Sequence, residues 1–540
     1  MNVTISRKKA ARAVLAWTLS LALTAPVAVS TTAFAAEEAT TQTQSADTQI
    51  DGQISTTDTQ TGNTQTQPPQ GQPPQGGPGG PPPMGPPPDG STPPGPPPDG
   101  STPPGPPPDG QQGQPPQMPN GQQGQNGSMG QPPQGGPGQQ QTKSASEFSA
   151  TKVVDAATEN LSSGTFDATD TDANAVLVRN GGTLTLTGAT LSKTGDSSSA
   201  DASNFSGQNA IFLAADSTAE LSHLTLTSDA DGANAVFATG PSAKVTAKNL
   251  KIHTKNNSSR GLDATYDGTI VAEDVDITTE GEHCAALATD RGEGTVTVDG
   301  AKIQTSGQGS PNVYSTGAIT LKNATGVSTG SEIAVVEGKN SITLANVDLT
   351  GTKDHGVMLY QSFSGDAGVG EASFTAKDST LRNNSDGPMF FVTNTTAKAS
   401  LQNVELLQQG ATLVNVAAGR WGASGSNGGN FTLTAKDQVL TGAVKADNIS
   451  SVTLNLDEGA DYEGMFNSED TAKSAAITLA KTAKWSLTGD AYVTTLTDAV
   501  KGYKNIASNG HNIYYDKDAA SDLGGRTYAL PGGGKLTPKA

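Results

Sequence analysis

One short pattern recurs along most of this chain: four residues with apolar side chains at the second and fourth positions. It occurs at residues 223–226, 249–252, 274–277, 300–303, 324–327, 346–349, 378–381 and 403–406. Only Thr325 and Ser379 depart from the apolar rule, and both are small. Successive units end 26, 25, 26, 24, 22, 32 and 25 residues apart. A period in this range is typical of a solenoid, in which each repeat packs against its neighbours.

Each period contains three short segments of alternating apolar and polar residues, as at 261–264, 269–271 and 274–277. Alternation with a period of two, without a 3.6-residue pattern, predicts strands rather than helices. Three short strands in each coil of about 22–26 residues describe an all-β right-handed parallel β-helix. The first residue of the four-residue unit is often Asn or Asp, which suits a tight bend. We therefore predict a solenoid over residues 146–437, with further coils and a cap over 438–540.

The second residue of the first strand is apolar in every coil, and we predict that these residues form a column that faces the core. This column reads Ile211, Val236, Leu262, Ala286, Val313, Val335, Val357, Phe390 and Val414. The following residue of each coil would then face outward, and that column contains the aromatic residues Phe212, Phe237, Tyr314 and Phe391. Monomeric soluble proteins rarely leave an apolar stripe open. The stripe therefore predicts a binding or self-association surface, or a face that other segments cover.

The first 145 residues differ in composition from the repeats. Residues 1–35 contain basic residues, an apolar run and the triplet Ala33-Phe34-Ala35, in the order expected of a secretory signal peptide. Residues 36–145 are rich in Gln, Thr, Pro and Gly and include the decapeptide STPPGPPPDG twice in tandem. So few large apolar side chains cannot offset the entropy of ordering, which predicts a disordered stalk. We expect a secreted, extracellular protein that associates with a cell surface.

Charge and composition exclude several kinds of partner. The chain carries 33 basic and 52 acidic residues, for a net charge of −19 at pH 7. Repulsion from phosphate groups argues against nucleic acid and anionic lipid as partners. No apolar run after residue 35 reaches the roughly 20 residues that a membrane-spanning helix needs, so no membrane insertion is expected. The single cysteine, Cys284, excludes an intramolecular disulfide and is expected to be a small core residue.

The repeat region resembles secreted bacterial parallel β-helix proteins of the pectin-lyase-like superfamily, in its non-enzymatic adhesin or carbohydrate-binding branch. Residues 485–496 (WSLTGDAYVTTL) look like the closing coil of autotransporter passenger domains. Residues 509–516 (NGHNIYYD) are similar to the closing region of secreted β-helices of carbohydrate-binding type. The resemblance implies the solenoid fold and a polysaccharide or cell-wall glycan as partner.

Enzymes of that superfamily act on acidic polysaccharides with Ca²⁺-binding carboxylates and a basic proton acceptor, or with paired carboxylates. The nearest candidates here are Asp267, Asp290 and Arg291, which fall at one corner of consecutive coils. Both aspartates lie close to glycine in turn-like segments, which favours a structural role. A lyase or hydrolase of acidic glycans remains an alternative function, and no catalytic residue is assigned.

Two oxygen-rich segments are candidates for binding Ca²⁺. They contain Asp167, Asp170 and Asp172 in one and Asp229 and Asp231 in the other. Neither segment has the complete pattern of a helical Ca²⁺-binding loop, which favours solvated turns. No other cofactor is expected.

Two insertions enlarge the corner that follows the first strand, at residues 361–371 and 417–430. One coil separates them, so they should stand within ~10 Å of each other. Tyr360, Phe363, Arg420 and Trp421 lie in or beside them, and aromatic faces with adjacent donors suit stacking on sugar rings. We therefore predict a β-helix that binds carbohydrate or a surface without catalysis. A structural, self-associating surface protein is the other alternative.

Overall fold

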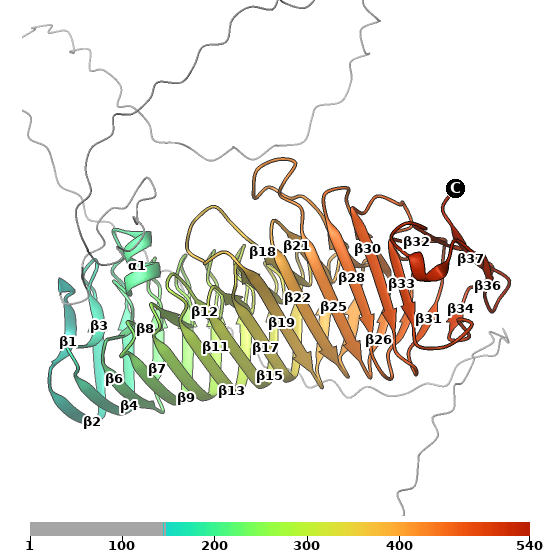
Figure 1. Cartoon of the computed structure of the whole chain (residues 1–540). Helices are drawn as coiled ribbons and strands as arrows, with labels where there is room; N and C mark the ends of the chain where they lie inside the picture. Colours follow the sequence, from blue (N-terminus) through green and yellow to red (C-terminus); the bar gives the residue numbers. More distant parts are fainter. Residues whose placement is uncertain (1–143, 145–146) are drawn as a thin grey trace, which may run out of the picture. The chain divides into compact units, whose positions relative to one another are not determined.

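The computed structural model describes Ser144 and residues 147–540. These residues form a parallel β-solenoid of about 16 turns, which confirms the all-β fold predicted from the repeat (Figure 1). The predicted signal peptide (1–35) and, apart from Ser144, the predicted stalk (36–145) lie outside the described residues. In the described part of the chain, no helix is long and apolar enough to cross a membrane.

One wall of the solenoid is a 12-stranded parallel sheet, here called sheet A, to which each coil up to β27 contributes one short strand. Its strands in spatial order are β1 (Ala150–Asp155), β3 (Asn174–Arg179), β5 (Phe212–Ala215), β8 (Val236–Thr239), β10 (Leu262–Thr265), β12 (Leu287–Thr289), β14 (Val313–Ser315), β16 (Ala334–Glu337), β18 (Val357–Tyr360), β21 (Phe390–Thr393), β24 (Thr412–Val416) and β27 (Ala443–Ala446). The insertions that concern function follow strands of this sheet.

The second wall, here called sheet B, contains longer strands that also pair in parallel from coil to coil. They are β2 (Thr158–Ala168), β4 (Thr183–Lys193), β6 (Thr218–Ser222), β7 (Thr225–Ser228), β9 (Lys244–Thr254), β11 (Thr269–Thr279), β13 (Thr295–Thr305), β15 (Ala318–Ser328), β17 (Ser341–Gly351), β19 (Glu371–Lys377), β20 (Thr380–Asn383), β22 (Thr396–Gln402), β23 (Glu405–Gln408), β25 (Asn430–Lys436), β28 (Ser451–Leu456), β30 (Ser474–Leu479) and β33 (Thr495–Asp498). The second and third of the three segments predicted in each coil join into one bent strand from β9 to β17. In β6/β7, β19/β20 and β22/β23 they form two separate strands.

The bend in sheet B lies at the predicted column of Asn and Asp. Asn249, Asp274 and Asn346 adopt φ angles of 55°, 54° and 55°, in the left-handed region that Asn and Asp tolerate best after glycine. Their side chains also link neighbouring coils, since Asn346 Nδ2 donates to Asn323 Oδ1 at 2.6 Å. The bend therefore follows from residue type as well as from packing.

The inward residues of both sheets form one continuous core. Phe374, Phe390 and Phe431 follow one another along it, with ring centroids 6.0 Å apart in an edge-to-face pair and 6.1 Å apart in a tilted pair. Cys284 is buried at a corner, where its Sγ accepts from the Ser259 N–H at 3.0 Å. Burial raises the pKa of this thiol to about 11, as expected of a structural cysteine.

The hydrogen-bond register of sheet A departs from the predicted core column at Ile211, Ala286 and Val335, although Ile211 and Ala286 are also fully buried in the core. The hydrogen-bond register aligns Phe212, Val236, Leu262, Leu287, Val313, Ala334, Val357, Phe390 and Val414. Phe212 therefore belongs to the core and not to the outward stripe. A strand of three or four residues inside an uninterrupted apolar run has no alternation to set its phase, so pairing with the neighbouring coil decides which side faces inward.

The coils continue to the end of the described chain. Two smaller sheets contain β26 (Val439–Thr441), β29 (Asp461–Glu463), β31 (Lys484–Ser486) and β34 (Ile506–Ala507), and β32 (Ala491–Val493), β35 (Ile513–Tyr515), β37 (Lys535–Pro538) and β36 (Tyr528–Ala529). A 3-10 helix spans Ser521–Leu523. The antiparallel pairing of β36 with β37 departs from the coil pattern at this end.

Candidate functional site

The two predicted insertions lie side by side on one edge of the solenoid. Residues 361–370 follow β18 and residues 417–429 follow β24, with β21 between these strands in sheet A. Asn394, just after β21, joins them: its backbone N–H donates to Asn427 O at 3.0 Å and its Nδ2 donates to Gln361 O at 2.8 Å. Counting coils in the sequence therefore placed the two loops correctly.

The four aromatic and basic residues that sequence reasoning selected form one cluster. The Trp421 ring centroid lies 5.7 Å from that of Tyr360 and 6.2 Å from that of Phe363. The Arg420 guanidinium lies over the Trp421 ring at 4.5 Å. Phe363 is 66% exposed, whereas Tyr360 is buried beneath the cluster. The indole Nε1 of Trp421 has no hydrogen-bond partner, although the protein encloses it.

A buried carboxylate supports this cluster from below. Glu337, which is 1% exposed, accepts hydrogen bonds from the hydroxyls of Tyr314 at 2.6 Å and Tyr360 at 2.8 Å, and from Ser362 Oγ. These bonds fix the start of the first loop and the ring on which Trp421 packs. Sequence reasoning missed Glu337. An acidic residue at the end of the otherwise apolar strand Ala334–Glu337 was the available signal.

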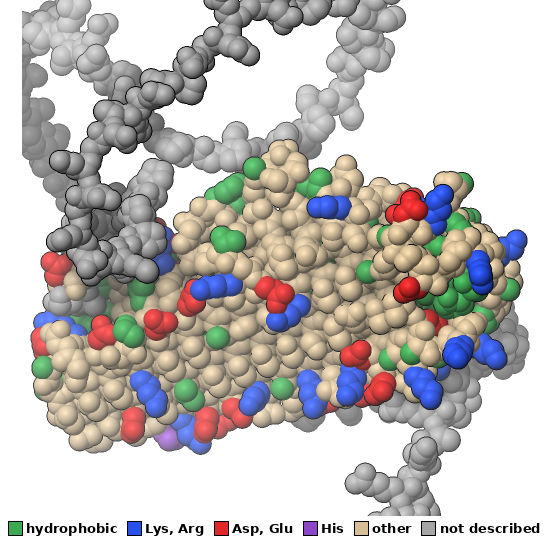
Figure 2. Space-filling view, in the orientation of Figure 1, with side chains coloured by type: hydrophobic (Ala, Val, Ile, Leu, Met, Phe, Trp, Pro, Cys, Tyr) green, Lys and Arg blue, Asp and Glu red, His purple; other side chains and the backbone are tan. Residues whose placement is uncertain are grey.

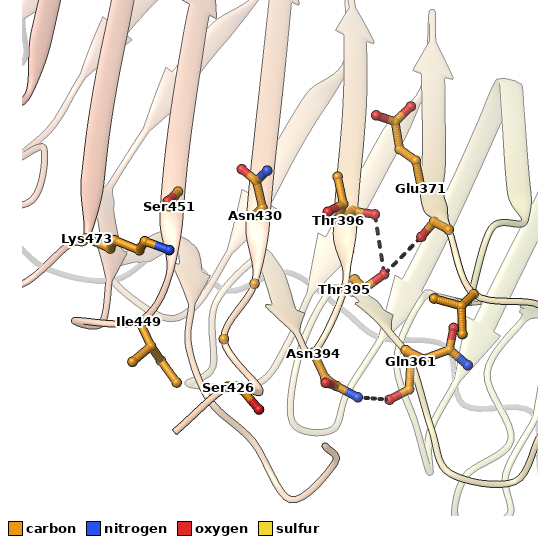
Figure 3. A pocket seen from close by; sticks show the side chains of 14 residues that line it. Gln361, Glu371, Asn394, Thr395, Thr396, Ser426, Asn430, Ile449, Ser451 and Lys473 are labelled. Carbon is orange, nitrogen blue, oxygen red and sulfur yellow. Dashed lines mark hydrogen bonds between the residues drawn. The ribbon is translucent and has the colours of Figure 1, made fainter. Parts of the chain in front are cut away.

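A polar groove of about 570 Å³ adjoins the bases of the two loops (Figure 3). Amide and hydroxyl side chains predominate in its lining, with Glu371 and Lys473 on opposite sides. The polar lining includes Gln361, Asn394, Thr395, Thr396, Ser426, Asn430 and Ser451. Gln361 is only 8% exposed, and its Oε1 has no hydrogen-bond partner in the described part of the chain. The groove thus offers a ligand both donors and acceptors without a strong net charge.

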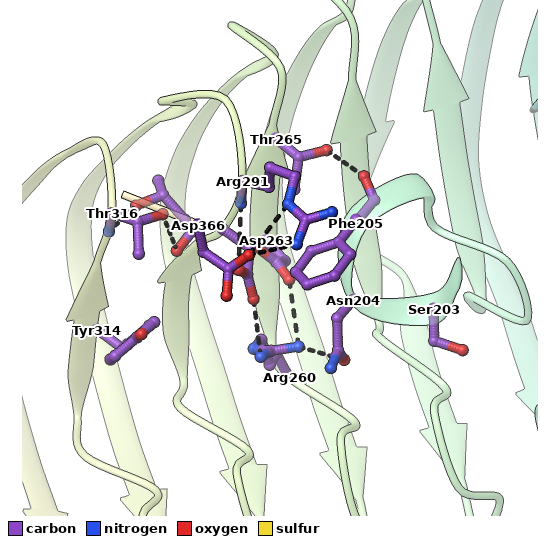
Figure 4. A network of polar contacts seen from close by, with 12 residues as sticks. Ser203, Asn204, Phe205, Arg260, Asp263, Thr265, Arg291, Tyr314, Thr316 and Asp366 are labelled. Carbon is purple, nitrogen blue, oxygen red and sulfur yellow. Dashed lines mark hydrogen bonds and ion pairs between the residues drawn. The ribbon is translucent and has the colours of Figure 1, made fainter. Parts of the chain in front are cut away.

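The candidate catalytic residues lie at one corner of consecutive coils, where the Asp267 N–H donates to Gly292 O at 2.8 Å, but their side chains have different surroundings. Figure 4 shows Arg260 and Arg291 in the polar network at this corner. Asp290 is 5% exposed and forms an ion pair with Arg260 at 2.9 Å. Arg291 instead pairs with Asp366 at 2.6 Å. Asp267 is exposed in a turn with a φ angle of 65°, which supports the turn role favoured from the sequence. The Asp290 and Arg291 side chains are therefore engaged by other partners.

Arg260 is the centre of a buried charged network that the sequence did not reveal. Besides Asp290, it contacts Asp263 at 3.7 Å and donates to Asn204 Oδ1 at 2.6 Å. Both oxygens of Asp263 are buried without a hydrogen bond. Burial raises the pKa values of both Asp263 and Asp290, and the positive charge of Arg260 opposes this rise. The nearby Asp263 and Asp366 raise the pKa of Asp290 further. One buried guanidinium faces two buried carboxyl groups, which favours protonation of one of them.

The buried charges around Arg260 predict how the stability of the protein depends on pH. A carboxyl whose pKa is raised by folding contributes stability that is complete below its unfolded pKa of about 4 and is lost as the pH rises through the folded pKa. Asp263→Asn cannot ionise, so it should gain stability relative to the unmodified protein as the pH rises from about 4 to about 6, the folded pKa of Asp263, by about 1.4 kcal/mol per unit of pKa shift. Denaturant unfolding across this range measures the difference. Asp267→Asn, in its exposed turn, is the control, and a pH-independent difference for Asp263→Asn would contradict the prediction.

The predicted outward stripe is covered. Helix α1 (Ala200–Ser206), an insertion capped by Ser199 and by Gly207 in the left-handed conformation, packs over sheet A (Figure 1). Phe237 is fully buried in a small cluster with Phe148 and Leu213, and Phe212 faces the core. Phe391 stacks on His355 at 4.4 Å, and Tyr314 is half-buried with its hydroxyl on Glu337. These four residues therefore do not form one open apolar surface.

Arg291 joins two of these insertions. Its guanidinium lies 3.8 Å from the centroid of the Phe205 ring in α1 and also pairs with Asp366 in the loop 361–370. Phe205 O accepts from Thr265 Oγ1 at 2.9 Å, which fixes α1 to β10. Segments far apart in the sequence thus form one cover over the charged network.

The candidate Ca²⁺ ligands have protein donors as partners. The buried Lys193 donates from Nζ to Asp170 O at 2.9 Å and to Gly195 O, near the carboxylates of Asp196, Asp170 and Asp172. Burial lowers the pKa of this lysine to about 8, against the opposing effect of those carboxylates. Among the described residues, no group of three or more His, Cys, Asp or Glu could hold a metal ion.

The remaining candidates also bond within the protein. Asp167 accepts from Ser192 Oγ, Asp231 accepts from the Asn257 N–H at 3.0 Å, and Asp229 O accepts from Asn256 Nδ2 at 2.6 Å. These contacts join neighbouring coils, so the oxygen-rich segments act as corner links within the solenoid.

The fold and the loop site define a parallel β-solenoid with an aromatic cluster and an adjoining polar groove. No family model, curated protein or solved structure matches the chain. The fold assignment therefore rests on the repeat and on the structure.

Proposed function

We propose that this protein is a secreted or cell-surface β-helix that binds carbohydrate, such as a polysaccharide or cell-wall glycan, without catalysing its cleavage. The observation that carries the proposal is the juxtaposition of Trp421, Phe363 and Arg420 with the polar groove. Aromatic rings supply stacking area for the apolar faces of sugars, and the amide and hydroxyl groups of the groove match sugar hydroxyls.

The charged residues nearby support binding rather than turnover. Among the arginines, Arg179, Arg260, Arg291 and Arg382 pair with carboxylates. Arg420 has no carboxylate partner among the residues that the structure describes and lies on the Trp421 ring, so its donors are available beside the exposed Phe363. The Asp263 and Asp290 carboxyl groups lie beneath α1 and the loop 361–370, away from the groove lining.

Trp421→Ala tests the proposal directly. Loss of the stacking surface should weaken glycan binding by about 1–3 kcal/mol, with little change in the unfolding midpoint. A glycan array identifies the ligand, titration calorimetry measures the loss, and a reducing-sugar assay on the same sample checks for cleavage. Arg420→Ala should weaken binding similarly, and the two losses should not add because both residues contact one ligand.

Tyr492→Ala is the matched control, since Tyr492 stacks on Tyr514 at 4.9 Å near the end of the chain. It should leave glycan binding unchanged. If Trp421→Ala leaves binding unchanged but lowers the unfolding midpoint and promotes association, Trp421 is a structural cover. That result would favour a self-associating surface protein.

A further inference from the structure

Sheet B carries two regular columns of hydroxyl side chains on its outward face. The register places Thr297, Thr320, Thr343, Thr375, Ser400 and Thr434 in one column, on consecutive coils from β13 to β25. Two residues earlier on these strands and on β28, the second column contains Thr295, Ser341, Ser373, Thr432 and Thr453. We call these two columns the hydroxyl platform. Successive coils place its side chains ~4.8 Å apart.

The hydroxyl groups of the platform are available to a ligand. Every member is half-buried or exposed. The one hydrogen bond to these hydroxyls in the described residues is a long one, from Asn455 Nδ2 to Thr434 Oγ1 at 3.5 Å. Each hydroxyl can both donate and accept, and each threonine adds a methyl group. The platform therefore offers a repeating array of donors, acceptors and small apolar contacts.

The platform has little charge on a chain whose net charge is −19. On the same strands, positions beyond the bend carry charged residues such as Lys302 on β13 and Asp348 on β17. Figure 2 shows this difference: uncharged side chains cover the face of the strands, and charged ones gather along its lower margin. The charged residue within the second column, Lys398, pairs with Glu371 at 2.5 Å. Hydroxyl residues also occur at outward positions beyond the bend, at Thr227, Thr278 and Thr350, so the platform differs from that region in its lower charge.

The platform is continuous with the groove at the loops. Thr396, Asn430 and Ser451 line the groove and occupy outward positions on β22, β25 and β28, two residues before the second column. The groove also contains Gln361, a buried side chain with an unpartnered carbonyl oxygen. A chain molecule bound in the groove can therefore extend onto the platform without leaving a polar, uncharged surface.

We propose that the hydroxyl platform binds an uncharged linear polysaccharide that extends from the groove across the strands of sheet B. This inference rests on the proposed function and names its ligand class. A polyanion would be repelled by the net charge, and a polycation would find few carboxylates on the platform. Sugar hydroxyls both donate and accept, as the platform hydroxyls do, and a repeating ligand can contact successive coils.

The test removes hydroxyls without changing side-chain shape. The triple variant Thr320→Val/Thr343→Val/Thr375→Val of the full chain should bind insoluble cellulose or β-1,3-glucan about tenfold more weakly in depletion isotherms. The matched control is Thr227→Val/Thr278→Val/Thr350→Val, which makes the same change at outward positions beyond the bend. It should bind as the unmodified protein does. Circular dichroism and unfolding midpoints should agree between the two triple variants.

The outcomes separate this inference from the proposed function. If the platform variant binds normally while Trp421→Ala loses binding, the loop site is supported and the platform inference is overturned. Binding to polygalacturonate alone, lost in Trp421→Ala, also overturns the neutral-ligand inference and leaves the proposed function intact. No binding to either neutral polysaccharide overturns the inference, and the glycan array separately decides the proposed function. Concentration-dependent sedimentation that the platform variant abolishes would instead identify a second copy of the chain as the occupant.

Discussion

Replacing Arg260 with methionine is expected to lower the free energy of unfolding by about 3–5 kcal/mol. Arg260 is 7% exposed and is the cation that contacts both buried carboxyl groups, at 2.9 Å for Asp290 and 3.7 Å for Asp263. Its removal leaves these groups buried without compensation and also removes a donor to Asn204 in α1. Denaturant unfolding measures the loss, and hydrogen exchange should show earlier opening of residues 200–206.

Two further variants identify the physical cause. Arg382→Met removes an exposed ion pair with Asp348 and should cost at most about 1 kcal/mol. Adding Asp263→Asn and Asp290→Asn to Arg260→Met should recover much of the loss, because no uncompensated charge remains. If Arg260→Met lowers the free energy of unfolding no more than Arg382→Met does, Arg260 does not stabilise buried, ionised carboxylates at Asp263 and Asp290.

Replacing Val357 with aspartate should destabilise the solenoid by several kcal/mol, about 4 or more. Val357 is fully buried, and its neighbours in the core column are Ala334 and Phe390. An aspartate there would be buried without a partner or would have to protonate. Because coils depend on their neighbours, unfolding should begin near β18. Thermal unfolding followed by circular dichroism, with hydrogen exchange to locate the opening, provides the measurement.

Thr278→Asp is the control for this prediction. Thr278 lies on the outward face of β11, between His253 and Gln304 of the adjacent coils. An aspartate at this solvated position should change stability by less than about 0.5 kcal/mol. Equal losses at Val357 and Thr278 would contradict the assignment of inward and outward positions.

The fold could be predicted because the repeat is long and its signal is redundant. A coil of this kind buries its apolar residues by stacking on the next coil, so the same constraint recurs in every period. The phase of sheet A could not be predicted in the same way. Phe212 lies in the apolar run Ala210-Ile211-Phe212-Leu213, where either neighbour satisfies the pattern. Only the pairing Phe212 to Val236 decides that Phe212 faces the core.

The loop site could be predicted in part. The lengths of the insertions and the number of coils between them predict that Trp421 lies near Phe363 and Tyr360, as the structure has it. This works because the regular spacing of coils relates distance along the sequence to position in space. The carboxylate beneath them, Glu337, was missed because no local pattern shows which hydroxyls it accepts from.

The sequence by itself determined the repeat, the strands, the bend at Asn and Asp and the corner that carries the insertions, because these follow from periodicity and local backbone preference. Only the tertiary structure decided which insertion covers which face. The Arg291 and Asp366 partners are 75 residues apart, and the Arg260 and Asn204 partners are 56 apart. Such pairs depend on where α1 and the loop 361–370 fold back over sheet A, and a charged side chain finds its partner by position in space rather than by spacing along the chain.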